Sequence, residues 1–180
     1  MVIKLKVIGI SGLPGSGKSY ISTYAMKNNY KVTSMGDVIR EEAEKRGEDT
    51  GTTAKNLRLE QGEYVVAKLT IKKVQNLIKD SSENIIVEGI RSPYEVEMFR
   101  DAFPNFTVLS VFASPKTRFK RISERARDDD TQDINEFRAR DKRELKFGIG
   151  SVVATSDYII INEDSFEAYQ KQIDEFFNKI

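Results

Sequence analysis

The chain has 180 residues, which suits one domain with a core of ordinary size. Its 29 lysines and arginines balance 28 aspartates and glutamates, so it lacks the basic excess that binds nucleic acid non-specifically. It has no cysteine and no histidine, which excludes disulfides, thiol catalysis, a histidine base and metal sites made of those residues. No apolar run is long enough for a membrane span and no signal peptide is recognisable. We therefore expect a cytoplasmic protein, a monomer or small homo-oligomer, with neither nucleic acid nor membrane as partner.

The first predicted elements are an apolar strand over residues 2–10 and a helix over about 17–28. Between them lies the pattern G-x-x-x-x-G-K-[ST], whose glycines let backbone N–H groups surround phosphate oxygens. Lys18 is expected to act in catalysis at the β- and γ-phosphates of ATP, and the Ser19 hydroxyl to bind Mg²⁺. The predicted nucleotide-binding residues are Gly12, Leu13, Pro14, Gly15, Ser16, Gly17, Lys18, Ser19 and Tyr20. The cofactors expected from this motif are ATP and Mg²⁺.

Strands and helices alternate along the rest of the chain. Further strands are predicted at residues 30–35, 84–88, 106–112 and 158–161. Helices are predicted over 36–46, from a polar loop at 48–53 to about 79, from Pro93, from Pro115, up to about Phe147, and over 166–180. Residues 148–150 are expected to end the helix before them. The pattern predicts one α/β domain over 1–180, a P-loop NTPase with three α/β/α layers and a five-stranded parallel sheet.

Ligands of such sheets bind at the carboxyl ends of the strands. Glu88 ends the apolar strand at 84–88, and a carboxylate at this place is where P-loop proteins hold Mg²⁺. We therefore predict that Glu88 and Ser19 share the metal ion. A helix-capping or surface carboxylate is the alternative for Glu88.

The segment Gly36-Asp37-Val38-Ile39-Arg40 resembles the Gly-Asp-x-Leu-Arg segment of adenylate kinases and related nucleoside monophosphate kinases. The resemblance implies that Arg40 binds the acceptor's α-phosphate, a task that suits a bidentate guanidinium. It also implies an acceptor-binding helical segment at about 36–80, which includes Gly36 and Asp37. Alternatively, Asp37 caps its helix and Arg40 pairs with Glu44 one turn on.

The segment Glu88-Gly89-Ile90-Arg91 is similar to the Asp-Gly-Phe-Pro-Arg segment of the same family, which implies that Gly89 and Arg91 bind the acceptor. The acid is Glu, one residue of the Phe-Pro pair is missing, and Glu-Gly is closer to cytidylate kinases. Where adenylate kinases place a glutamine that reads adenine, this chain has Glu95, which can accept from an exocyclic amine. The base preference stays open between adenine and cytosine.

Seven of the twelve arginines lie between residues 118 and 143. The run Arg127-Asp128-Asp129-Asp130, with Arg138 and Arg140 after it, resembles the arginine-rich lid flank of adenylate kinases. The resemblance implies a short lid at about 127–136 whose arginines neutralise the transferring phosphate. The candidate catalytic arginines are Arg127, Arg138 and Arg140, with Arg121 and Arg143 as weaker candidates. The alternative is a solvated helix with acidic partners.

Residues 157–162 resemble the last strand of this family and of dephospho-coenzyme A kinases, which implies that Asn162 lies near the adenine of ATP. A plain turn residue is the alternative. The resemblance favours an ATP-dependent kinase of AMP or a similar monophosphate. Two alternatives remain: a hydroxyl kinase such as a dephospho-coenzyme A kinase, with Asp37 as base, and a nucleotide-binding sensor or assembly protein with little turnover.

Overall fold

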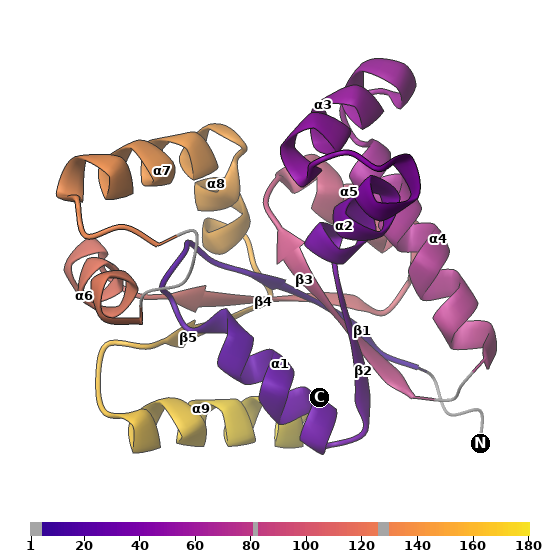
Figure 1. Ribbon diagram of the computed structural model, residues 1–180. Helices are drawn as coiled ribbons and strands as arrows, with labels where there is room; N and C mark the ends of the chain where they lie inside the picture. The colour runs from indigo at the N-terminus through magenta and orange to yellow at the C-terminus, as the bar shows by residue number, and fades with distance from the viewer. Residues whose placement is uncertain (1–4, 81–82, 126–129) are drawn as a thin grey trace.

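The computed structural model describes residues 5–80, 83–125 and 130–180. Its centre is one sheet of five parallel strands in the order β2-β3-β1-β4-β5 (Figure 1). The strands are β1 (Val7–Ser11), β2 (Tyr30–Ser34), β3 (Asn84–Ile90), β4 (Phe106–Phe112) and β5 (Tyr158–Ile161). This is the predicted P-loop α/β fold.

Nine helices lie within the described residues: α1 (Lys18–Lys27), α2 (Met35–Arg46), α3 (Thr50–Gln61), α4 (Val65–Asp80), α5 (Pro93–Ala102), α6 (Pro115–Arg125), α7 (Ile134–Lys146), α8 (Ile149–Ala154) and α9 (Phe166–Lys179). Helices α1 and α9 cover one face of the sheet, and α4, α5 and α8 cover the other (Figure 1). Helices α2 and α3 pack beside α4. No helix in the described ranges is long and apolar enough to cross a membrane.

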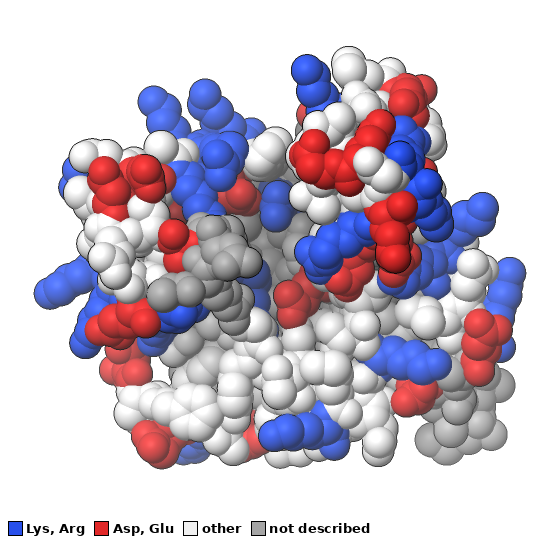
Figure 2. Space-filling model, in the orientation of Figure 1, with Lys and Arg blue, Asp and Glu red and all other residues white. Residues whose placement is uncertain are grey.

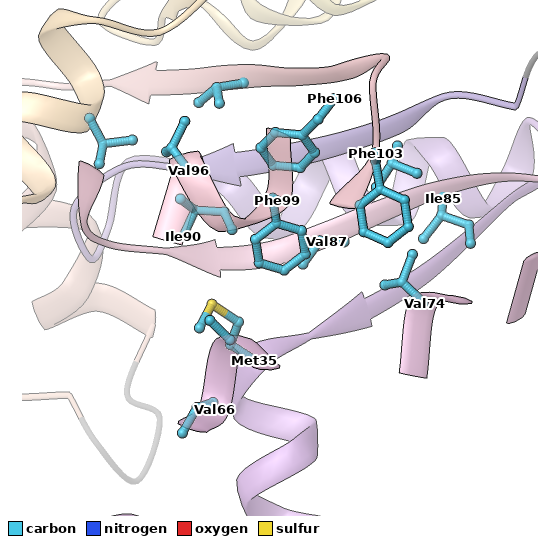
Figure 3. Packing of buried hydrophobic residues seen from close by; sticks show 14 of the residues in the cluster. Met35, Val66, Val74, Ile85, Val87, Ile90, Val96, Phe99, Phe103 and Phe106 are labelled. Carbon is cyan, nitrogen blue, oxygen red and sulfur yellow. The ribbon is translucent and has the colours of Figure 1, made fainter. Parts of the chain in front are cut away.

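Alternation along the strands divides the core into two layers. On β1, Val7 points to the side of α4 and α5, whereas Ile8 and Ile10 point to the side of α1 and α9. The first layer contains a stack of Phe99 on Phe106, with ring centroids 5.1 Å apart (Figure 3). Burial of both faces explains why the strands read as continuous apolar runs.

Several predicted boundaries were wrong. The strand expected to end at Glu88 continues to Ile90, so Glu88 lies within β3, and the strand predicted at 30–35 ends at Ser34. The loop predicted at 48–53 is confined to residues 48–49, because Asp49 accepts hydrogen bonds from the N–H groups of Gly51 and Thr52 and α3 starts directly after it. The predicted long helix is divided at Gly62, whose φ of 93° no helical residue adopts. Gly148 ends α7 as expected, but it also precedes a further helix, α8.

The order of the strands creates a crevice at the end of β1. The chain leaves β1 through α1 on one face, and it leaves β3 through α5 on the opposite face. Ligands of open α/β sheets bind where the connections diverge in this way, beyond the carboxyl ends of the strands. Figure 2 shows the surface hollowed there, between the lobe with α6 and α7 and the lobe with α2 and α3.

Candidate functional site

The phosphate-binding loop joins β1 to α1 and is held by side chains from the C-terminal part of the chain. Gly17 has a φ of 111°, and a side chain there would collide with Asn162. Asn162 is buried; its Nδ2 donates to the Ser16 carbonyl at 2.8 Å, and its Oδ1 accepts from Arg121 at 3.1 Å. The Tyr169 hydroxyl donates to the Gly17 carbonyl at 3.1 Å. The amide of Asn162 thus joins the phosphate-binding loop to Arg121, which belongs to α6.

Lys18 is the first residue of α1, and its side chain folds back into the phosphate-binding loop. Its Nζ donates to the carbonyl oxygens of Gly12 at 2.5 Å and Leu13 at 3.1 Å. Burial lowers the pKa of Lys18 to about 8, and the opposing pull of Glu88 and Glu144 is smaller. The carbonyl oxygens of the loop therefore hold the ammonium in place, and an anion beside it would stabilise its charged form.

A cavity of about 200 Å³ lies over the loop, and we call it the phosphate cavity. It is lined by Gly12, Pro14, Gly15, Gly17, Lys18, Ser19, Glu88, Gly89, Ile90, Arg91, Arg125, Arg140, Glu144 and Ile149. The structure therefore brings together side chains that the sequence places on four different segments. Arg125 and Glu144 are lining residues that the sequence did not single out.

Ser19 and Glu88 both line the phosphate cavity and carry the kind of ligand atom that a magnesium ion prefers. Both offer oxygen atoms, and Glu88 also accepts a hydrogen bond from the Ser22 hydroxyl, which fixes the carboxylate. Within the described residues no group of three acidic side chains forms a complete metal cage. Mg²⁺ typically takes one or two protein ligands and completes its shell with phosphate oxygens and water. The residues present fit that mode of binding.

Arg91 lies where the phosphate cavity meets a second cavity. Its Nε forms an ion pair with the buried Glu144 of α7 at 3.4 Å. This pair links the loop after β3 to α7 across the crevice.

The second cavity has a volume of about 290 Å³, and we call it the acceptor pocket after the residues predicted to bind the acceptor. It is lined by Met35, Gly36, Ile39, Arg58, Glu63, Tyr64, Val66, Ala67, Gly89, Arg91, Ser92, Tyr94, Glu95, Lys146 and Phe147. Four predicted acceptor residues, Gly36, Gly89, Arg91 and Glu95, are among them. The rings of Tyr64 and Tyr94 lie 5.5 Å apart in it. This pair was not predicted, since Tyr64 directly precedes α4 and continues the apolar spacing of that helix.

Two other predicted acceptor residues are engaged locally. Asp37 and Ser34 form a capping box at the start of α2, and Asp37 also binds Arg40. Hydrogen bonds from Arg40 and Ser34 lower the pKa of Asp37 against the opposing effect of burial, which is the largest single influence. Arg40 is exposed and does not line the acceptor pocket. Neither side chain therefore lines the phosphate cavity or the acceptor pocket.

Glu95 serves two purposes. Its Oε2 accepts from the backbone N–H groups of Arg91 and Ser92, which completes a capping box at the start of α5. Burial raises the pKa of Glu95, and the same two hydrogen bonds oppose the shift. Its carboxyl group shapes the turn that carries Arg91 and also lines the acceptor pocket.

The predicted lid arginines divide into separate groups. Arg140 faces the phosphate cavity, whereas Arg138 lines a groove on the outer side of α7. Arg127 lies outside the described residues. Arg121 holds Asn162, and Arg143 is exposed. The single helix α7 thus turns Arg138 and Arg140 to opposite sides.

Comparison with known proteins agrees with this geometry. A family model described as AAA domain matches residues 11–138. The loop, the parallel sheet and the phosphate cavity define a nucleotide-binding P-loop protein with a kinase-like fold, the class that comprises phosphotransferases. A protein from Methanothermobacter thermautotrophicus, named UPF0200 protein, is 50% identical over 99% of this chain and 92% of its own. A UPF0200 protein from Pyrococcus abyssi is 44% identical over 97% and 96%. The chain belongs to the AAA domain family and to the UPF0200 proteins.

Two solved structures show the same fold. TT1252 from Thermus thermophilus superposes with a TM-score of 0.71 at 17% identity, over 98% of both chains. Shikimate kinase from Acinetobacter baumannii, in complex with shikimate, gives a TM-score of 0.59 at 13% identity, over 97% of this chain and 92% of that one. At these identities the likeness concerns the arrangement of strands and helices.

Proposed function

We propose that the protein transfers the γ-phosphate of ATP–Mg²⁺ to AMP or a similar nucleoside monophosphate. The observation that carries the proposal is the pair of adjoining cavities. One is built on the phosphate-binding loop and the other contains an aromatic pair, and they share Gly89 and Arg91. Such a layout suits two substrates whose phosphates meet at Arg91.

On the donor side, the phosphate cavity offers four cations, Lys18, Arg91, Arg125 and Arg140, and two carboxylates, Glu88 and Glu144. Positive charge around the transferring group is the main catalytic requirement of phosphoryl transfer. An oxygen of the acceptor's phosphate attacks the γ-phosphorus as the bond to the β,γ-bridging oxygen breaks, which releases ADP. Magnesium bound at Ser19 and Glu88 would neutralise charge on the β- and γ-phosphates.

On the acceptor side, the rings of Tyr64 and Tyr94 offer aromatic faces to a planar base. Arg91 stands at the end of the pocket that opens to the phosphate cavity, where the monophosphate must lie. A phosphate acceptor is already ionised, so the reaction needs no general base. The absence of histidine is compatible with this chemistry.

A hydroxyl acceptor is the second candidate, and Glu144 is the observation in its favour. Hydroxyl transfer benefits from a nearby carboxylate that takes the proton. Asp37, the base suggested by the sequence, is engaged in the capping box of α2. Glu144 is buried in the phosphate cavity beside Arg91 and would serve in its place.

The proposal is tested by the rate of ADP formation from ATP–Mg²⁺ in the presence of AMP, CMP, UMP, GMP, dTMP or dephospho-coenzyme A. We expect a monophosphate, AMP first, to stimulate turnover. Arg91→Ala should raise the acceptor's KM and lower kcat/KM by roughly 100-fold, because a charge-assisted contact to the acceptor is removed. Arg100→Ala, a change of an exposed arginine that pairs with Asp157, is the matched control.

Three results have different meanings. Stimulation by a monophosphate supports the proposal. Stimulation by dephospho-coenzyme A alone, abolished in Glu144→Gln, supports the hydroxyl kinase. Tight binding of ATP with no acceptor-stimulated turnover contradicts both and favours a sensor or assembly protein.

A further inference from the structure

A third cavity shares no lining residue with the phosphate cavity and only Lys146 with the acceptor pocket. It is a groove of about 840 Å³ between α6 and α7, which we call the outer groove. It is lined by Pro115, Lys116, Phe119, Ile134, Phe137, Arg138, Asp141, Lys142, Leu145 and Lys146. Nothing in the phosphate-transfer scheme uses it.

The floor of the outer groove is apolar. Phe137 is buried and packs against Phe119, with ring centroids 5.3 Å apart. At either end of α7, Ile134 and Leu145 remain 37% and 51% exposed. Large apolar side chains that line one concave strip are typical of a surface that another molecule covers.

The rim of the outer groove is positively charged. Arg138, Lys142 and Lys146 follow one another every four residues on α7, and Lys116 faces them from α6. In the described parts of the chain, none of these four cations has a carboxylate within ion-pair distance. Lys and Arg side chains gather over the α7 lobe in Figure 2.

The acidic residue of the outer groove does not offset this charge. Asp141 forms a two-pronged ion pair with the buried guanidinium of Arg118, at 2.7 and 2.5 Å. The negative charge of Asp141 is therefore balanced by Arg118 inside the protein. Among the described residues, the groove combines an apolar floor with a row of cations that have no ion-pair partner.

We propose that the outer groove binds an acidic amphipathic helix of a partner protein. The floor extends along α7 from Ile134 to Leu145, a length of about 16 Å, which matches three turns of helix. A helix of that length places apolar residues on the floor at spacings of three and four. Acidic residues spaced by four along its flank would face Arg138, Lys142 and Lys146.

The probe for this proposal is a synthetic helical peptide of about 14 residues, with leucines at spacings of three and four and glutamates along one flank. Amide chemical shifts of the isotopically labelled full chain report where it binds. We expect shifts at 115–119 and 134–146, and binding that weakens with added salt. Lys142→Glu should weaken binding by about ten-fold, whereas Lys68→Glu, which makes the same charge change on α4, should leave it unaltered.

The apolar floor has its own pair of variants. Leu145→Gln should weaken binding by about five-fold, and Leu59→Gln, a change of a leucine that is 75% exposed on α3, should have no effect. Both sites are exposed, so both variants should fold, which circular dichroism verifies.

Other occupants are outcomes that would overturn the proposal. A peptide with lysines in place of the glutamates that binds equally well would remove the role of charge. Self-association lost in Leu145→Gln, with no peptide binding, would assign the groove to a second copy of the chain. Binding of vesicles of anionic lipid that is lost in Lys142→Glu, with no peptide binding, would assign it to a membrane surface.

Discussion

Lys18 is an ammonium group enclosed by its own loop, and its surroundings prepare it for an anion. Its Nζ is held by the carbonyl oxygens of Gly12 and Leu13, and burial lowers its pKa to about 8. Phosphate groups placed beside the ammonium would favour its charged form and raise the pKa again. We therefore expect binding of the nucleotide and protonation of Lys18 to be coupled.

This coupling predicts the pH dependence of ATP binding. Above about pH 8 the free protein has lost the proton of Lys18 and the complex keeps it, so the affinity should fall by up to about ten-fold per pH unit. Calorimetry at about pH 9, in two buffers with different heats of ionisation, should detect uptake of close to one proton.

Lys18→Arg is the control, because its guanidinium stays charged in this range. The variant should bind ATP without uptake of a proton. An equal uptake by the variant and the unaltered protein would assign the proton to another group.

At the residue scale, the phosphate-binding loop was predictable because each specified position of its motif has a known role in phosphate binding. The sequence was less informative where a side chain can form hydrogen bonds with the backbone of its own helix instead of binding a ligand. Asp37 and Glu95 both stand third in a helix, where a carboxylate completes a capping box. Tyr64 has the spacing of a core residue and yet lines the acceptor pocket. Spacing alone does not distinguish a buried face from the wall of a pocket.

At the scale of elements, the joint between α6 and α7 supports the phosphate-binding loop. Arg118 of α6 is 1% exposed; it donates to the Pro14 carbonyl at 3.2 Å and binds Asp141 of α7. Its guanidinium also lies over the ring of Phe137, 5.1 Å from the centroid. One buried cation thus joins two helices to the loop.

Removal of its partner should be costly. Asp141→Ala leaves the charge of Arg118 buried and unpaired, and we expect the free energy of unfolding to fall by about 3 kcal/mol. Urea denaturation measures the change. Glu175→Ala, which breaks the exposed pair with Lys171, should cost about 0.5 kcal/mol or less.

A double variant separates the charge from the packing. Arg118→Met combined with Asp141→Leu removes both charges and should be more stable than Asp141→Ala alone. If the single variant lost no more stability than Glu175→Ala, the ion pair would not be the joint that the geometry indicates.

Element boundaries were predicted well for two continuous apolar strands and poorly where a glycine has two possible roles. The strands at 106–112 and 158–161 agree with the structure at both ends. Gly62 interrupts a helix, whereas Gly148 both ends one helix and precedes another. Both glycines have a positive φ, which ends a helix at each of them. The amino-acid sequence does not state the φ angle of a glycine, so it did not predict the break at Gly62 or the helix that starts after Gly148.

At the scale of the whole molecule, the chain leaves β1 and β3 on opposite faces of the sheet, and the phosphate cavity and the acceptor pocket meet beside these strand ends. The order of the strands was open from the sequence, although their number and direction were predicted. The contact of the two cavities at Gly89 and Arg91 follows from that order, because β3 lies beside β1. The outer groove left no motif in the sequence, since it depends on the packing of α6 against α7.

The central claim is that the two cavities form one transfer site, and a ligand that spans both tests it most directly. We would measure binding of a diadenosine polyphosphate by calorimetry, with Lys18→Ala and Arg91→Ala as variants of the donor and acceptor ends. The account predicts one ligand per chain, bound at least about ten-fold more tightly than ATP or AMP, and weakened by both variants. An affinity no higher than that for ATP, or one that Arg91→Ala leaves unchanged, would contradict it.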